Sequence, residues 1–182
     1  MTNRILKIHP KNYNVLYDFI SVRRRDYLAS SASIGTVMIS GCSSLGNDQY
    51  TADAEEYLLS HRDIGRILSE DFGGEIVRYD EIEGVESGAA FENRRHSLVS
   101  FGLLVCESVE ESEILYDSLL SDTDGWGEEL DIGDGAVYDA IQGSRLLGVR
   151  LSNVMIQMNG RADFQDMERL AETQIDEIKN IG

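Results

Sequence analysis

The chain has 182 residues and carries 33 acidic against 16 basic side chains, a formal net charge of −17 at pH 7. Binding to nucleic acid requires a basic face that neutralises phosphates, so this balance argues against nucleic acid as a partner. An acidic disordered tail is the other interpretation of such a charge, but the regular apolar spacing described below argues against it.

The first predicted element is an export signal in the N-terminal part of the chain. Two adjacent arginines, one arbitrary residue, an aromatic residue and a leucine form the pattern that the twin-arginine translocase reads, so this translocase is the predicted partner during export. A weakly apolar segment, 29–41, follows and is shorter than the roughly 18–20 residues that span a bilayer. This layout is typical of a signal peptide covering residues 1–41. The predicted export residues are Arg24, Arg25, Tyr27 and Leu28.

A lipid attachment site is predicted where the apolar segment ends. A branched apolar residue and two small residues precede a cysteine, as in the lipobox Ile39-Ser40-Gly41-Cys42. Cleavage would make Cys42 the new N-terminus and its sulfur the site of lipidation. The polar residues that follow suit a flexible tether over 42–52. The alternative is a buried helix with a chance arginine cluster and a core cysteine.

The segment before the arginine cluster is unusually long for the head of a signal peptide. Val22 stands directly before the cluster, and a valine codon can start translation. We therefore suspect that residues 1–21 are a start-site overrun. The alternative is a long cytoplasmic head that is removed together with the signal.

The chain after the predicted cleavage site is more acidic than the whole. Residues 1–41 hold six basic and two acidic side chains, which leaves 31 acidic and 10 basic residues, a net charge of −21, in residues 42–182. Nine of these basic residues are Arg, and the tenth is Lys179. This composition resembles proteins of extreme halophiles, particularly haloarchaea. At molar salt the Debye length is about 3 Å and self-repulsion is screened, so the resemblance implies reduced stability in ordinary buffer.

The first half of the remaining chain alternates between predicted helices and strands. Asp53 can cap a helix over 54–72, although Gly65 weakens it and two shorter helices would also fit. Strands are predicted over 75–82 and 96–108, the second with clean alternation of apolar residues. Ser108 and Glu111 form a capping box, which predicts a helix over 109–122 with Ile114, Leu115 and Leu119 facing inward.

The second half is predicted to hold strands and one long helix. Strand patterns cover 135–142 and 146–160, and the alternation changes parity at Ser152-Asn153, which indicates a tight hairpin. Asp163 caps a helix over 164–181 with one apolar stripe. This order predicts an α+β fold, a single small domain over 53–182 in which helices pack on one face of an antiparallel sheet.

The stretch GVRLSNVMIQMNG followed by an acidic helix is similar to extracellular sensor-type domains of bacterial surface kinases and lipoproteins. The resemblance covers about the last 80 residues and rests on a hydrophobic pattern. It implies a secreted domain that binds a ligand or acts as a scaffold. It assigns no functional residues.

The sequence gives little support for catalysis. It contains no nucleophile elbow, no dinucleotide or phosphate loop and no zinc spacing, so no cofactor is predicted. His61 and His96 are predicted to be surface polar residues, and Cys106 a packing residue within a strand.

The acidic loop 121–129 holds the remaining candidate residues. Asp122 and Asp124 are spaced like the start of a calcium loop, but the fifth and twelfth positions lack the required ligands. A solvated acidic turn is therefore the favoured interpretation, and no metal site is predicted. Trp126 could contact a sugar or a partner, although folding back onto the core is favoured.

These features together predict a non-enzymatic domain held by lipid on Cys42 to the extracellular face of a halophile's cell membrane. The domain would bind a ligand or an envelope partner. The alternatives are a small surface hydrolase and a cytoplasmic acidic interaction protein whose arginine cluster is fortuitous.

Overall fold

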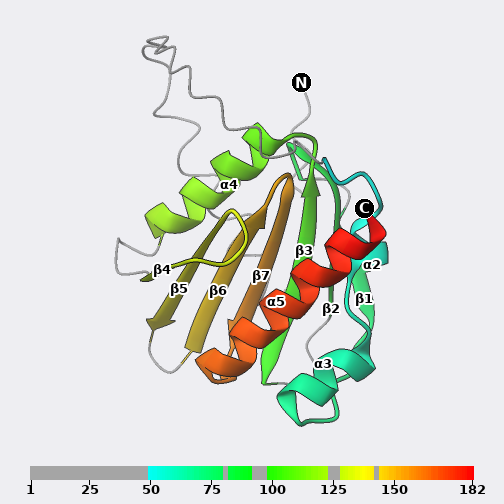
Figure 1. The fold of residues 1–182 in the computed structure, drawn as a ribbon, viewed down its shortest axis with the longest axis vertical. Coiled ribbons are helices and arrows are strands. Elements are labelled where there is room, and N and C mark those ends of the chain that lie inside the picture. The colour runs from blue at the N-terminus through cyan, green and yellow to red at the C-terminus, as the bar shows by residue number, and fades with distance from the viewer. Residues whose placement is uncertain (1–48, 80–81, 92–97, 123–127, 142–143) are drawn as a thin grey trace, which may run out of the picture.

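The structure is a computed structural model that describes residues 49–79, 82–91, 98–122, 128–141 and 144–182. Within these ranges the chain forms four helices and seven strands (Figure 1). The helices are α2 (Ala54–Tyr57), α3 (His61–Leu68), α4 (Val109–Asp122) and α5 (Phe164–Ile181). The strands are β1 (Ile76–Arg78), β2 (Val85–Phe91), β3 (Val99–Cys106), β4 (Glu128–Leu130), β5 (Gly135–Ile141), β6 (Ser144–Leu151) and β7 (Val154–Gly160).

All seven strands pair antiparallel in one sheet with the order β1-β2-β3-β7-β6-β5-β4. The central pair, β3 and β7, is in continuous register from Val99↔Gly160 to Val105↔Val154. Strands β6 and β7 pair up to Leu151↔Val154, which leaves a two-residue turn. The tight hairpin predicted at Ser152-Asn153 is therefore confirmed, and the α+β fold with an antiparallel sheet is confirmed as well.

The larger core lies between one face of the sheet and helices α2, α3 and α5. We call this face of the sheet the front face, because α5 crosses it on the side nearest the viewer in Figure 1. The alternating apolar residues of β3 and β7 contribute to it. The buried stripe of α5 faces these strands, as the helical spacing predicts. The stripe consists of Met167, Leu170, Ala171, Gln174, Ile175 and Ile178.

Helix α4 lies on the opposite, rear face, where a second and smaller core forms. Leu115 and Leu119 of α4 are buried there together with Leu104 and Met155 of the sheet. The placement of all helices on one face therefore does not hold for α4. The physical reason is that the central strands β3 and β7 also carry apolar residues on the rear face, among them Leu104 and Met155, so both faces require a cover. Ile114, predicted to face inward, is 50% exposed.

Strands β2 and β4 were not predicted from the sequence, and the break between α2 and α3 was predicted only as an alternative. Strand β2 runs through small residues such as Gly88 and was not predicted, because its residues show no apolar alternation. The short edge strand β4 lies in a segment interpreted as loop. The segment 54–72 forms two short helices, because Leu58 is extended and Ser60 caps α3, as the alternative prediction allowed.

The fully buried side chain of Gln174 explains why this break is stable. Its carbonyl oxygen accepts a hydrogen bond from Leu59 N at 3.1 Å, and its amide donates to the Tyr57 carbonyl oxygen at 2.6 Å. Backbone groups that the helix break leaves unpaired thus find partners on α5. Gln174 therefore ties the linker between α2 and α3 to the front helix.

Candidate functional site

Asn153 joins three parts of the chain at the β6–β7 turn. Its fully buried side chain accepts a hydrogen bond from Tyr50 N at 2.8 Å and donates to the carbonyl oxygens of Tyr50 at 2.8 Å and Cys106 at 2.9 Å. These bonds use both amide protons and one acceptor position. The bonds fix the point where the described chain enters the domain. We call this end of the sheet, which holds the β6–β7 turn and Tyr50, the tether end.

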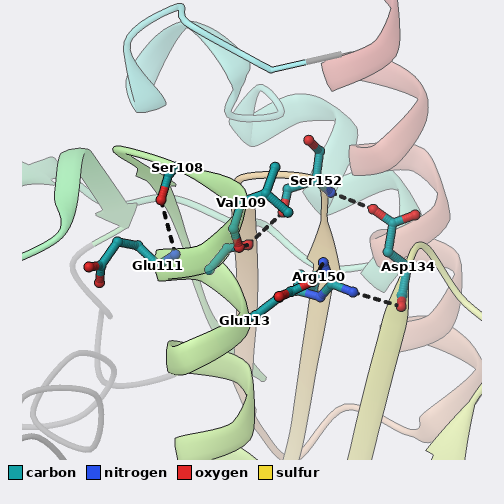
Figure 2. A network of polar contacts seen from close by, with 8 residues as sticks. Ser108, Val109, Glu111, Glu113, Asp134, Arg150 and Ser152 are labelled. Atoms are coloured by element: carbon teal, nitrogen blue, oxygen red, sulfur yellow. Dashed lines mark hydrogen bonds and ion pairs between the residues drawn. The ribbon is translucent and has the colours of Figure 1, made fainter. Parts of the chain in front are cut away.

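A polar network beside this turn attaches the first turn of α4 to the hairpin (Figure 2). Glu111 N donates to Ser108 Oγ at 3.2 Å, which confirms the predicted cap. The Ser112 hydroxyl lies 2.7 Å from the Val109 carbonyl oxygen and 2.6 Å from that of Ser152. Because a hydroxyl has one proton, it donates to one of these oxygens at a time.

Asp134 and Arg150 complete the network on the β5 side of the turn (Figure 2). Ser152 N donates to the Asp134 carboxylate at 2.5 Å. The Arg150 guanidinium, with a side chain 16% exposed, donates to the Asp134 carbonyl oxygen at 3.3 Å and lies 3.5 Å from the Glu113 carboxylate. Every member of this network has a partner, so the network stabilises the tether end and presents no free binding group.

Tyr116 of α4 packs beside this network and carries a raised pKa. Burial of the phenol is the largest cause, and the nearby Glu129 carboxylate adds to it, while Arg150 opposes it. A raised folded-state pKa contributes stability below the ordinary tyrosine pKa and loses it as pH rises through the folded value.

We therefore expect the free energy of unfolding to fall in strongly alkaline solution and Tyr116→Phe to reduce that fall. Denaturant unfolding at neutral and alkaline pH measures how far the free energy of unfolding falls in each protein. An equal fall in the wild type and in Tyr116→Phe would contradict the assignment.

A second group of polar side chains lies on the rear face, at the end of the sheet away from the tether end. Register and strand parity place Gln157 and Asn159 of β7, Ser100 of β3 and Asp139 of β5 on this face. We call these four residues the rear polar cluster. Three of them are buried: Ser100 is 3% exposed, Asp139 is 7% and Gln157 is 2%.

Two members of the rear polar cluster hold buried atoms without a hydrogen-bond partner in the described part of the chain. These atoms are Asp139 Oδ2 and both the Nε2 and Oε1 atoms of Gln157. Leaving a buried polar group unpaired costs about 1–3 kcal/mol, and native proteins rarely tolerate it without a reason. Buried side-chain atoms without a partner in the described residues gather in this cluster, which is therefore the candidate binding site.

Glycines flank Gln157 on both neighbouring strands, Gly102 of β3 and Gly148 of β6. A Cβ atom built on Gly148 would lie 2.2 Å from Leu119 Cδ2, so α4 packs directly against this glycine. A Cβ atom on Gly102 would have its three nearest neighbours in β2, the closest 2.9 Å away in Ala90.

The rear polar cluster contains acceptors and amide donors but no cation. The two rows of paired residues that contain it include no basic side chain. Asn159 is half-buried, and its Oδ1 accepts a hydrogen bond from Ser144 at 2.7 Å. The cluster can therefore bind hydrogen-bond donors and cationic groups, and it disfavours anions.

Most residues singled out from the sequence lie outside the described residues. This holds for the export residues Arg24, Arg25, Tyr27 and Leu28, for the lipobox Ile39, Ser40 and Gly41, for Cys42, and for His96, Asp124 and Trp126. Asp122 is the last residue of α4, and its side chain is not among those described. These candidates therefore stay predictions.

His61 and Cys106 are described and have structural surroundings. The His61 ring packs against Phe91 with ring centres 4.5 Å apart, and Nε2 donates to the Gly74 carbonyl oxygen at 2.9 Å. It is half-buried among aromatic rings, so its prediction as a surface polar residue is wrong. This arrangement gives no support to a histidine-dependent hydrolase. Cys106 is fully buried, which confirms its predicted packing role.

Gln157 and Asp139 were missed because each lies within a strand of otherwise ordinary pattern. The alternation Val154, Ile156 and Met158 draws attention to the front face and leaves Gln157 on a face that would normally meet solvent. Gln157 pairs with a glycine on each neighbouring strand, which sets it apart from other strand residues. This pairing can be recognised only once the register of the strands is known.

Two further features, a membrane-spanning helix and a metal-binding cluster, were sought in the part of the chain that the structure describes. No helix there is long and apolar enough to cross a membrane. No group of three or more His, Cys, Asp or Glu side chains there is placed to hold a metal ion.

Comparison with solved structures gives distant similarities, among them the following two. The chain is similar to the extracellular domain of PknH from Mycobacterium tuberculosis, with a TM-score of 0.48 and 9% identity over 72% of this chain and 98% of that domain. It is also similar to a GTP binding regulator from Thermotoga maritima, with a TM-score of 0.35 and 16% identity over 66% and 84% of the respective chains. No family model and no curated protein matches the chain. Both similarities are too distant to identify a function.

Proposed function

We propose that this chain is an exported, lipid-anchored domain that binds a small ligand without chemical turnover, on the outer face of a halophile's cell membrane. The twin-arginine translocase exports the folded chain, and lipid on Cys42 then holds it at the membrane. The observation that supports a binding role is that both polar atoms of the Gln157 carboxamide and Asp139 Oδ2 are buried without a partner in the described residues.

The entry point of the chain supports the proposed anchoring. Tyr50 is buried and hydrogen-bonded to Asn153, so its place in the domain is fixed. Eight residue steps separate Tyr50 from Cys42. An extended chain spans about 3.3–3.6 Å per residue, which limits this tether to roughly 28 Å. An anchored domain would therefore stay close to the membrane with its tether end toward it. The rear polar cluster would lie at the end of the sheet away from the membrane.

Substitutions in the leader are expected to change the location of the protein without changing its fold. Cys42→Ser should move the chain from the membrane fraction to the soluble or secreted fraction of a haloarchaeal host, because the sulfur that carries the lipid is lost. Replacing both Arg24 and Arg25 with Lys should retain the uncleaved chain inside the cell, because the translocase reads the pair.

Matched controls separate these effects from general damage. Ser43→Ala, next to the lipidation site, and Arg23→Lys, next to the arginine pair, should both leave the distribution unchanged. Fractionation followed by immunodetection measures all four proteins. Membrane association of Cys42→Ser equal to that of the wild type would contradict lipid anchoring.

A further inference from the structure

We propose that two exposed isoleucines at the tether end, Ile114 of α4 and Ile181 of α5, contact the lipid surface of the membrane. This inference rests on the proposed lipid anchor and names the surface of the domain that faces the membrane. Its starting observation is that three large apolar side chains are exposed in the described part of the chain. They are Leu98, Ile114 and Ile181, which are 40%, 50% and 42% exposed.

Ile114 lies near the tether end on the rear face of the sheet. The Ser112 hydroxyl, in the first turn of α4, lies 2.6 Å from the carbonyl oxygen of Ser152 in the β6–β7 turn. Ile114 is two residues further along the helix, which is about 3 Å along its axis. Its neighbour Leu115 is buried against the sheet, whereas Ile114 is exposed on the outer side of α4.

Ile181 lies at the same end of the domain, on the front face. A Cβ atom built on Gly182 would lie 2.6 Å from Cδ1 of Tyr50, so the last turn of α5 lies beside the point where the chain enters the domain. The two isoleucines are therefore on opposite sides of the sheet at its tether end, as the positions of α4 and α5 in Figure 1 indicate. Leu98 lies at the other end, directly before the start of β3.

The predicted tether brings this end of the domain within reach of the lipid. Eight residue steps separate Tyr50 from Cys42, whose lipid would lie in the membrane. The tether makes contact with the membrane an intramolecular event, so a weak apolar contact forms at a high effective concentration. Two isoleucines can therefore make a contact that the unanchored protein would not make.

The charges at the tether end are compatible with this contact in concentrated salt. Two exposed carboxylates there, Glu107 and Glu110, would be repelled by anionic head groups. In molar salt the Debye length is about 3 Å, so this repulsion is confined to close approach, whereas apolar contact is not screened. Lys179, the one lysine of residues 42–182, is exposed in the same last turn of α5 as Ile181 and can pair with a head-group phosphate.

Chemical labelling of Lys179 tests the inference, because residues 42–182 contain no other lysine. Lipidated protein from a haloarchaeal host is reconstituted into vesicles of phosphatidylcholine and phosphatidylglycerol in molar KCl. A water-soluble amine-reactive ester then labels Lys179, and mass spectrometry of its peptide measures the rate. We expect a rate at least about threefold lower than in Cys42→Ser mixed with the same vesicles, because a contact formed about two-thirds of the time leaves about one-third of the molecules accessible.

Substitution of the exposed apolar residues makes the test specific. Ile114→Ser and Ile181→Ser should each raise the labelling rate toward that of the unanchored protein, and neither should unfold the domain, because both side chains are exposed. Leu98→Ser is the matched control, since it removes a similarly exposed apolar side chain from the other end of the domain. It should leave the labelling rate of Lys179 unchanged.

A lysine at the other end of the domain provides a reference for general effects of the vesicles. Arg161→Lys adds an exposed lysine beside Leu98, to whose carbonyl oxygen the backbone N of residue 161 donates. This lysine should be labelled at the same rate with and without the lipid anchor.

Flotation of the vesicles separates this inference from the proposed anchor. Wild-type protein that does not float with the vesicles would contradict the anchor and the contact together. Protein that floats, but in which Lys179 is labelled as fast as in Cys42→Ser, would overturn the contact alone. Slow labelling on whole cells but not on vesicles would also overturn it, because an envelope protein would then cover the two isoleucines.

Discussion

Asn153→Ala is expected to lower the free energy of unfolding by about 2–4 kcal/mol, because three buried backbone groups lose their partner at once. The side chain is fully buried and bonds to both polar backbone groups of Tyr50 and to the carbonyl oxygen of Cys106. The substitution should therefore loosen the segment before α2 as well as destabilise the whole domain.

Two further substitutions make this test specific to the hydrogen bonds of Asn153. Asn153→Asp keeps the acceptor for Tyr50 N but places a carboxylate oxygen opposite two carbonyl oxygens, so it should destabilise at least as much as Ala at neutral pH. Asn180→Ala, on the exposed side of the last turn of α5, should change stability by less than about 0.5 kcal/mol. Denaturant unfolding measures the free energies, and limited proteolysis reports release of the segment around Tyr50. A stable Asn153→Ala protein with unchanged proteolysis would contradict the role of this side chain.

Gly160→Ala is expected to cost about 2–4 kcal/mol, because the added methyl group has no room and its neighbours are backbone atoms. A Cβ atom at Gly160 would lie 2.1 Å from the Leu98 carbonyl oxygen and 2.7 Å from Val99 Cα. That carbonyl oxygen is fixed by hydrogen bonds from Arg161 N at 2.6 Å and Ala162 N at 3.2 Å. Relief of the clash would break these bonds and separate the ends of β3 and β7.

Gly135→Ala is the matched control for this substitution. A Cβ atom at Gly135 would lie 3.2 Å from the ring of Tyr116, a side chain that can shift by a few tenths of an ångström. We expect a change below about 1 kcal/mol in the free energy of unfolding. Chemical denaturation of both variants checks the comparison, and equal losses would show that backbone contact at Gly160 does not decide the outcome.

The parts of the fold that the sequence predicts are those with a strong local pattern. Helix α5 has a capping aspartate and one continuous stripe, and its bounds agree with the prediction. The β6–β7 hairpin is marked by a change of parity at Ser152-Asn153. Strand β2 has neither signal, because small residues from Ser87 to Ala90 fill it, and its pairing with β3 depends on contacts distant in sequence. The position of α4 on the rear face likewise depends on the sheet order.

The candidate site could not be predicted from the sequence for a related reason. Gln157 and Asp139 lie about 18 residues apart in the chain, and each is the kind of polar residue that normally faces solvent on a strand. Their placement on one face follows from the order and register of β5, β6 and β7. The predicted export residues and lipobox stay predictions, since they lie outside the described residues.

Mass spectrometry of the N-terminal peptide, from protein produced in a haloarchaeal host, tests most directly the claim that this chain is a lipid-anchored surface domain. The proposal predicts a mature peptide that begins at Cys42 and carries lipid on its sulfur. Mature protein from the soluble fraction whose peptides still contain Met1, or the arginines at 23–25, would contradict it and favour the cytoplasmic alternative.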